Sequence, residues 1–390
     1  MDREGSAFRG PLGPGAGSFL TEYRIDSPNR FKTEEEKMAQ EWSPPSHWIR
    51  ITTLDVHTAG EPLRIVTGGL PPIPGKTILE KRRYARENWD HFRTALMWEP
   101  RGHADMYGAI LTEPVTEDGD AGVLFIHNEG FSTMCGHGII GLAMAGVQGG
   151  AVALDEGAPL GGDEAPKTPG PLRLDTPAGR VTAFSEVEDR RITGASFLNV
   201  PSFVYALDQE VEVEGMGVVR YDVAFGGAFY AFCRAEELGM KLEAGDFRFI
   251  MDVGMKIKRA VMASLPIEHP FEADLGFLYG TIIVGEAHDA GNHSRNVCIF
   301  AEGEVDRSPT GTGVSARAAL HFARGELKVG DPFTVESILG TTFTGQVVDP
   351  TRFGPHEAVI SRVSGTSHIV GRTEILIDPE DPLRHGFILR

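Results

Sequence analysis

Residues 133–138 read Thr-Met-Cys-Gly-His-Gly and stand between two regular patterns. Residues 122–127 form a short apolar run typical of a buried strand, and residues 139–145 continue small and apolar without proline, as a helix would. Cys135 is therefore predicted at a strand-to-helix turn, where free backbone N–H groups and the positive end of the helix dipole meet. Such a position binds carboxylate or phosphate and lowers the pKa of a cysteine. The stretch predicts an anion site with a base beside it.

A second copy of this pattern lies farther along the chain. Residues 295–300 are predicted as a strand, residues 306–313 (Asp-Arg-Ser-Pro-Thr-Gly-Thr-Gly) as a turn and residues 314–324 as a helix. Cys-Gly-His-Gly in the first copy corresponds to Thr-Gly-Thr-Gly in the second, so the reactive position holds Cys135 in one and Thr310 in the other. A weak internal repeat of this kind predicts two related halves whose helix N-termini face one ligand.

Residues 127–137 and 306–313 closely resemble the two active-site motifs of the proline racemase family. Residues 55–64 and 99–108 resemble further family motifs, and the likeness runs from about residue 48 to the C-terminus. Racemases and hydroxyproline epimerases of this family have cysteine at both reactive positions, whereas this chain has threonine at the second. That Cys/Thr pairing resembles the trans-3-hydroxy-L-proline dehydratase branch, which implies a hydro-lyase.

The resemblance also implies a role for each motif residue. Cys135 would be the catalytic base, and backbone N–H groups from both helix starts would hold the substrate carboxylate. An aspartate would hold the ring nitrogen, and an anion beside a secondary ammonium is physically sensible. The substrate-binding positions are Gly136 and His137 at the first helix, Gly311 and Thr312 at the second, and Asp306 for the nitrogen.

The hydroxyl of Thr310 has too high a pKa to take a proton at neutral pH without a strong base beside it, so it is expected to hydrogen-bond the substrate at most. In trans-3-hydroxy-L-proline the C3 hydroxyl and the C2 hydrogen share one ring face, within reach of one thiolate. Cys135 is therefore expected to remove the C2 proton while helix-end N–H groups stabilise the developing charge. Loss of water gives Δ1-pyrroline-2-carboxylate after tautomerisation. The new thiol or a nearby acid would protonate the leaving hydroxyl.

Two alternatives stay open. A proline or 4-hydroxyproline epimerase would need water or another group in place of the second base. A non-catalytic imino-acid binding protein would hold pyrrole-2-carboxylate, a planar analogue of the intermediate, without turnover. The 13 histidines show no metal-ligand spacing, and the glycines are not followed by a dinucleotide fingerprint. Neither a metal nor an organic cofactor is expected.

Composition narrows the expected partners. The 390 residues carry a formal net charge of −18, which argues against nucleic acid and anionic membranes because both bind clustered Lys and Arg. Three cysteines are too few for a disulfide framework, and no apolar segment of signal-peptide length follows the start. We expect a cytoplasmic enzyme, a homodimer being one option, that acts on a small imino acid.

Strand-like runs outnumber helical ones and do not alternate regularly with them, unlike the pattern of a doubly wound sheet. Helical spacing predicts one helix over residues 77–97 and another over residues 249–265. The resemblance implies an α/β (α+β) fold of two pseudo-symmetric diaminopimelate-epimerase-like domains. Each would have curved β-sheets around a central helix, with the active site in the cleft between the domains.

The predicted domain boundaries follow the composition. Residues 1–46, rich in Gly, Pro and charge, are expected to be a disordered extension. Residues 47–200 would form the N-terminal domain, with residues 376–390 as a candidate completion, and residues 201–375 the C-terminal domain. The Gly/Pro/acid-rich segment 148–171 is expected to be a surface insertion.

Overall fold

The computed structural model describes residues 42–150, 170–189 and 191–389. Residues 47–390 group into one contact unit, in which strands predominate over helices. The predicted extension 1–46 lies almost wholly outside the described residues, and so does most of the predicted insertion 148–171.

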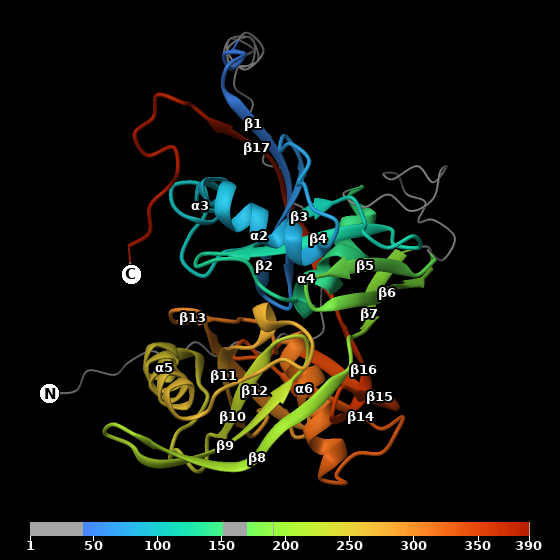
Figure 1. Cartoon of the computed structure of the whole chain (residues 1–390), viewed down its shortest axis with the longest axis vertical. Helices are drawn as coiled ribbons and strands as arrows, with labels where there is room; N and C mark the ends of the chain where they lie inside the picture. Colours follow the sequence, from blue (N-terminus) through green and yellow to red (C-terminus); the bar gives the residue numbers. More distant parts are fainter. Residues whose placement is uncertain (1–41, 151–169, 190, 390) are drawn as a thin grey trace, which may run out of the picture. The chain divides into compact units, whose positions relative to one another are not determined.

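The first group of strands pairs in the order β17, β1, β2, β3, β4, β5, β6, β7. Strand β7 then pairs with β16. Because β16 is followed after one residue by β17, the strand that begins the series, this group of strands closes on itself. Figure 1 shows β1 and β17 side by side. The bounds are β1 Ile49–Thr58, β2 Glu61–Gly68, β3 Tyr107–Thr112, β4 Ala121–His127, β5 Leu172–Thr176, β6 Gly179–Glu188, β7 Arg191–Leu198, β16 His356–Gly365 and β17 Ser367–Ile377.

The second group of strands also closes, in the order β16, β8, β9, β10, β11, β12, β14, β15 and back to β16. The short strand β13 (Glu304–Val305) pairs with β12. The remaining bounds are β8 Ser202–Val213, β9 Gly217–Phe225, β10 Phe229–Arg234, β11 Leu278–Gly285, β12 Ser294–Phe300, β14 Pro332–Glu336 and β15 Thr342–Phe353.

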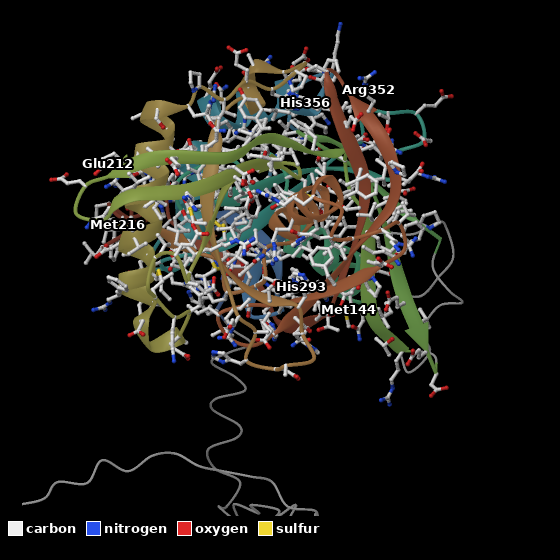
Figure 2. The ribbon with its side chains drawn as sticks, turned by 90° about the horizontal axis from the view of Figure 1, so that it is seen from below. Met144, Glu212, Met216, His293, Arg352 and His356 are labelled. Atoms are coloured by element: carbon white, nitrogen blue, oxygen red, sulfur yellow. The ribbon has the colours of Figure 1, made fainter. Side chains whose placement is uncertain are left out.

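Each closed group of strands encloses one helix. Helix α4 (Gly136–Gly141) packs against β1, β2, β7, β16 and β17 and continues into the π-helix η1 (Leu142–Gly146). Helix α6 (Gly311–Ala323) packs against β8, β9, β15 and β16, and Figure 2 shows it encircled by strands. Both predicted strand-turn-helix segments are therefore confirmed, and α6 ends just before Gly325, whose φ of +71° suits glycine.

The predicted helix 77–97 is in fact two helices, α2 (Ile78–Asn88) and α3 (Asp90–Met97). Trp89 between them leaves the helical conformation at φ −122°, ψ 12°. Its buried ring lies edge-on to Tyr84 of α2 and Phe92 of α3. The break therefore lets both helices cover the outer face of β1 to β4, where a separate apolar cluster lies. Periodicity alone does not report such a change of direction.

The prediction for residues 249–265 is confirmed as α5 (Phe247–Ser264), which packs against β11, β12 and β8. Two 3-10 turns, η2 (Ala244–Asp246) and η3 (Ala273–Leu275), flank this region. The main apolar core includes residues of α4 and α6 and of strands from both closed groups. The predicted domain division stays a prediction, although β17, placed by it mainly in the second domain, pairs along its length with β1.

Candidate active site

The starts of α4 and α6 meet at two glycines. A Cβ added to Gly136 would lie 2.5 Å from the Cα of Gly311, and one added to Gly311 would lie 2.7 Å from the Cα of Gly136. Contacts under 3.0 Å to backbone atoms cannot be relieved by a side-chain movement. Only glycine therefore fits at both helix starts, and the two positive helix ends share one small volume.

Four backbone N–H groups at these helix starts are available to an anion. The first N–H groups of a helix have no intrahelical acceptor. Among the described residues, no hydrogen bond uses the backbone N–H of Gly136, His137, Gly311 or Thr312. This arrangement fits the predicted carboxylate cradle, because donors from two helices converge on one place.

Cys135 caps α4 with its sulfur. The residue has extended backbone angles (φ −143°, ψ 108°), and its Sγ accepts the backbone N–H of Gly138 at 3.2 Å. The residue is buried and unpaired in any disulfide. The strand-to-helix turn therefore fixes the sulfur beside the predicted carboxylate cradle.

The prediction of a lowered pKa for Cys135 is wrong for this closed pocket. Burial raises the pKa of the Cys135 thiol well above its ordinary value, and the charges of Asp306 and Glu61 raise it further. The hydrogen bond from Gly138 acts in the opposite direction without outweighing burial. A helix start offers a thiolate a few N–H groups, whereas burial removes solvent from every side. Cys135 is a neutral thiol in this conformation.

The side chain of His137 contacts the same sulfur, which the sequence did not indicate. Its Nδ1 lies 3.2 Å and its Nε2 3.7 Å from the Cys135 Sγ. Burial lowers the pKa of His137 to about 4, so the ring is neutral at neutral pH. A hydrogen bond to the Pro62 carbonyl uses the single N–H of that ring. We infer that the other nitrogen is an acceptor for the thiol.

Thr310 occupies the matching position at α6 but differs in conformation and contacts. Its φ is +65°, an uncommon value for a β-branched residue. Its hydroxyl donates to the Asp306 Oδ2 at 2.8 Å, and the other carboxylate oxygen accepts the backbone N–H of Ser308 at 2.7 Å. The hydroxyl is therefore directed at the predicted nitrogen-binding aspartate and offers no base to a substrate.

The cavity at the helix starts has a volume of about 20 Å³. A single water needs roughly 10–15 Å³ by this measure, so a pyrrolidine ring enters only if the pocket opens. All the predicted site residues line this cavity. The further lining residues, which the prediction did not include, are Glu61, Tyr107, Met134, Tyr230, Tyr279, Cys298 and Phe300.

Three of these missed residues lie in motifs that the sequence already singled out. Glu61 belongs to the segment 55–64, Tyr107 to the segment 99–108 and Met134 to the segment 127–137, so those motifs were the available signal. Tyr230, Tyr279 and Cys298 lie on strands β10, β11 and β12, which belong to none of the four family-like motifs.

Glu61 is a fully buried carboxyl group on the wall beside Asp306. Its Oε2 accepts the backbone N–H of Arg307 at 2.7 Å and pairs with the Arg307 Nε at 3.0 Å. Its Oε1 has no hydrogen-bond partner among the described residues. Burial raises the pKa of Glu61 well above its ordinary value, against the opposing effect of Arg307.

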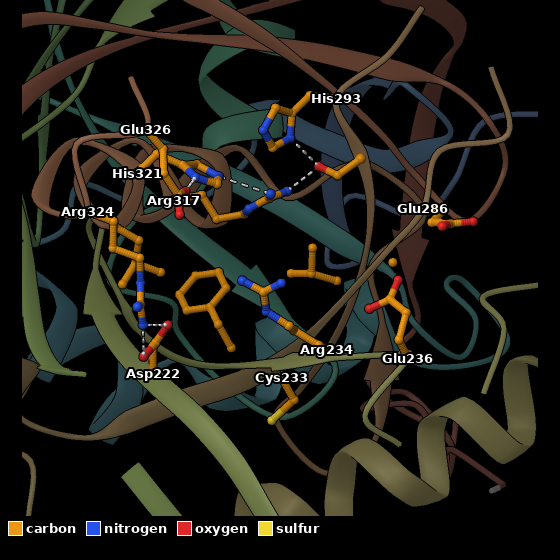
Figure 3. A pocket seen from close by; sticks show the side chains of 15 residues that line it. Asp222, Cys233, Arg234, Glu236, Glu286, His293, Arg317, His321, Arg324 and Glu326 are labelled. Atoms are coloured by element: carbon orange, nitrogen blue, oxygen red, sulfur yellow. Dashed lines mark hydrogen bonds and ion pairs between the residues drawn. The ribbon is translucent and has the colours of Figure 1, made fainter. Parts of the chain in front are cut away.

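A larger cavity of about 390 Å³ lies elsewhere along α6. Figure 3 shows Arg234 pointing into it and Arg317 bonded to His321 and to a neighbouring serine. No residue of the four family-like motifs lines this cavity. We therefore take the smaller cavity as the candidate active site, because the predicted site residues line it although its volume is lower.

The described residues show no obvious metal centre: no group of three or more His, Cys, Asp or Glu side chains could hold an ion. Nor does any helix in the described ranges have the length and apolar character needed to cross a membrane.

These features define a class of α+β proteins in which two enclosed helices meet, N-terminus to N-terminus, at a buried thiol. Residues 53–388 match the family described as proline racemase, and the chain belongs to that family. It is 44% identical over 354 residues to a trans-3-hydroxy-L-proline dehydratase of Colwellia psychrerythraea, covering 90% of this chain and 97% of the relative.

Other relatives carry different names. The chain is 41% identical to a proline racemase of Clostridioides difficile, over 87% of this chain and 98% of that protein. Its structure resembles that of a hydroxyproline epimerase from Agrobacterium vitis with bound trans-4-hydroxy-L-proline. That likeness has a TM-score of 0.80 at 29% identity, covering 88% of this chain and 96% of the other. The α+β fold expected from the sequence is thus confirmed.

Proposed function

We propose that this chain dehydrates trans-3-hydroxy-L-proline to Δ1-pyrroline-2-carboxylate without a cofactor. The observation that carries the proposal is the asymmetry of the two helix starts. One presents the thiol of Cys135, and the other presents the hydroxyl of Thr310, already donated to Asp306. One base suits elimination from one ring face, whereas inversion at C2 needs a proton donor on the opposite face. The name of the Colwellia relative supports the same activity.

In this proposal the substrate carboxylate binds the four free N–H groups at the starts of α4 and α6. Its ammonium binds Asp306, whose charge contributes to the raised pKa of Cys135. Neutralising that charge favours the thiolate, whose proton passes to solvent while the pocket is open to admit substrate. Cys135 then removes the C2 proton, and the helix ends stabilise the charge that develops on the carboxylate.

A second candidate function is favoured by one specific observation, the thiol of Cys298 in the same cavity. Burial, the largest effect, and the charge of Asp306 raise the pKa of Cys298 well above its ordinary value, against the opposing effects of Thr310 and Lys258. If Cys298 reached the second ring face, the protein could invert proline or 4-hydroxyproline at C2. Unlike Cys135, Cys298 lies within strand β12 and not at a helix start.

Proton NMR of purified protein in deuterated buffer would separate the two functions. Trans-3-hydroxy-L-proline, L-proline and trans-4-hydroxy-L-proline would each be incubated with it. Conversion of the 3-hydroxy compound to the pyrroline, with no inversion of the other two, is the expected result. Inversion of either at C2, with the 3-hydroxy compound unchanged, would refute the dehydratase and direct attention to a Cys298→Ala variant.

The homodimer and the cytoplasmic location also belong to the proposal. Light scattering of the purified protein would test the first, and cell fractionation the second.

A further inference from the structure

We propose that Tyr107 protonates the leaving C3 hydroxyl and regains its proton from Cys135, so that one thiol completes the dehydration. This inference rests on the proposed function and deepens it by naming the acid. It assigns a catalytic role to a side chain that the comparison of the two helix starts does not reveal.

Tyr107 is placed beside the base. It begins strand β3, is 3% exposed and lines the same cavity as Cys135. Its ring stands edge-on to that of His137, with centroids 4.8 Å apart, and the His137 Nδ1 lies 3.2 Å from the Cys135 Sγ. Its hydroxyl also lies 3.3 Å from that of Tyr279. Tyr107 and Cys135 therefore line the one cavity in which the proposed proton transfer would take place.

The walls of the cavity indicate which side of the substrate Tyr107 would meet. Asp306 and Glu61 form a polar wall, linked through Arg307. Tyr107, Tyr279 and Phe300 form an aromatic wall, with Tyr279 and Phe300 stacked at 5.4 Å. If Asp306 holds the ring nitrogen, the ring carbons beyond C2 face the aromatic wall, because apolar carbon packs against aromatic rings. C3 and its hydroxyl then lie toward Tyr107.

The protonation state is the one that an acid needs. Burial raises the pKa of Tyr107 well above its ordinary value, so the phenol holds its proton at neutral pH. A free phenolate in this site would be costly for the same reason. The transfer is therefore a relay, in which Tyr107 gives one proton as it receives another.

The electrons and protons balance within the site. The Cys135 thiolate takes the C2 proton, and the C2–H electron pair becomes the C2=C3 double bond. The C3–O pair leaves with oxygen, which takes the Tyr107 proton and departs as water. The new Cys135 S–H returns a proton to the Tyr107 oxygen, which restores thiolate and phenol. The enamine product then tautomerises to the imine, with no oxidant or reductant involved.

The rival acid in the same cavity is Glu61, whose buried carboxyl group also has a raised pKa. Its bond to Arg307, next to Asp306 in the chain, places it on the nitrogen wall and away from C3. The test must nevertheless separate the two residues, since both line the cavity and burial raises the pKa of both.

The test compares two leaving groups in the variants Tyr107→Phe and Glu61→Gln. Trans-3-hydroxy-L-proline loses hydroxide, which needs an acid, whereas trans-3-fluoro-L-proline loses fluoride, a much weaker base. Tyr230→Phe is the matched control, since it removes another buried hydroxyl from the same cavity, one that bonds the Thr312 Oγ1 at 2.7 Å. Rates of pyrroline formation are measured for both substrates, with thermal denaturation of each variant.

For Tyr107→Phe we expect dehydration to fall roughly 10²- to 10⁴-fold while fluoride elimination stays within a few-fold of wild type. Tyr230→Phe should change both rates by a similar factor. An equal loss of both reactions in Tyr107→Phe, or wild-type dehydration, would overturn the inference. The inference would also be overturned if Glu61→Gln lost dehydration but kept fluoride elimination near the wild-type rate. A wild-type protein inert toward the hydroxy substrate would instead refute the proposed function itself.

Discussion

Replacing Gly136 by alanine tests the meeting of the two helix starts most directly. The added Cβ would lie 2.5 Å from the Gly311 Cα and 2.8 Å from its carbonyl carbon, whereas ordinary contacts begin near 3.4 Å. Both close neighbours are backbone, so α4 and α6 must separate by about 1 Å, a displacement that can reduce a rate about 100-fold. Overpacking of this kind also costs about 1–3 kcal/mol of stability.

The assay measures dehydration of trans-3-hydroxy-L-proline, binding of pyrrole-2-carboxylate and thermal denaturation. Gly130→Ala is the matched control, because Gly130 lies in the same motif and a Cβ there meets nothing within 4 Å. We expect a folded Gly136→Ala protein with both activity and analogue binding reduced at least tenfold, and a control within twofold of wild type. Full activity in Gly136→Ala would refute the idea that converging helix starts hold the carboxylate.

Three further outcomes follow from the site. Cys135→Ser should lower the rate of dehydration at least 10³-fold while the affinity for pyrrole-2-carboxylate stays within tenfold of wild type. Substantial turnover by this variant would indicate a different base. Thr310→Cys should introduce C2 inversion of L-proline, detected by chiral chromatography, because it adds a thiol at the second helix start. Asp306→Asn should lower the pKa of Cys135, since the Asp306 charge raises it, so alkylation of Cys135 by iodoacetamide should begin at lower pH than in wild type.

The sequence predicted the parts of the site that depend on local chain geometry. The turns before α4 and α6 carry glycines, free N–H groups and a reactive residue at fixed spacing, and these features are local. Tyr230 and Cys298 could not be found in this way. They lie on central strands whose side chains alternate between core and pocket, and only the pairing of β10, β11 and β12 shows which face looks inward.

The protonation state of Cys135 could not be predicted from the sequence, for a different reason. The local signal, a helix start, favours the thiolate, and the sequence shows that signal alone. The opposing effect is the burial created when residues from both groups of strands close over the sulfur, and it depends on the whole fold. A helix N-terminus is therefore evidence of an anion site, but the pKa of a residue there follows from how much solvent reaches it.

A raised pKa also fits the proposed chemistry better than a lowered one would. The C2 proton of an imino acid is weakly acidic, and a thiolate with a high pKa is a stronger base toward it. The cost is that the thiolate must form only when substrate is present, and the ammonium held by Asp306 would supply the compensating charge. Pyrrole-2-carboxylate lacks that charge. It should therefore bind with Cys135 still protonated, and the ultraviolet thiolate absorbance of the complex should not rise at neutral pH, whereas a rise would show that the carboxylate cradle alone ionises the thiol.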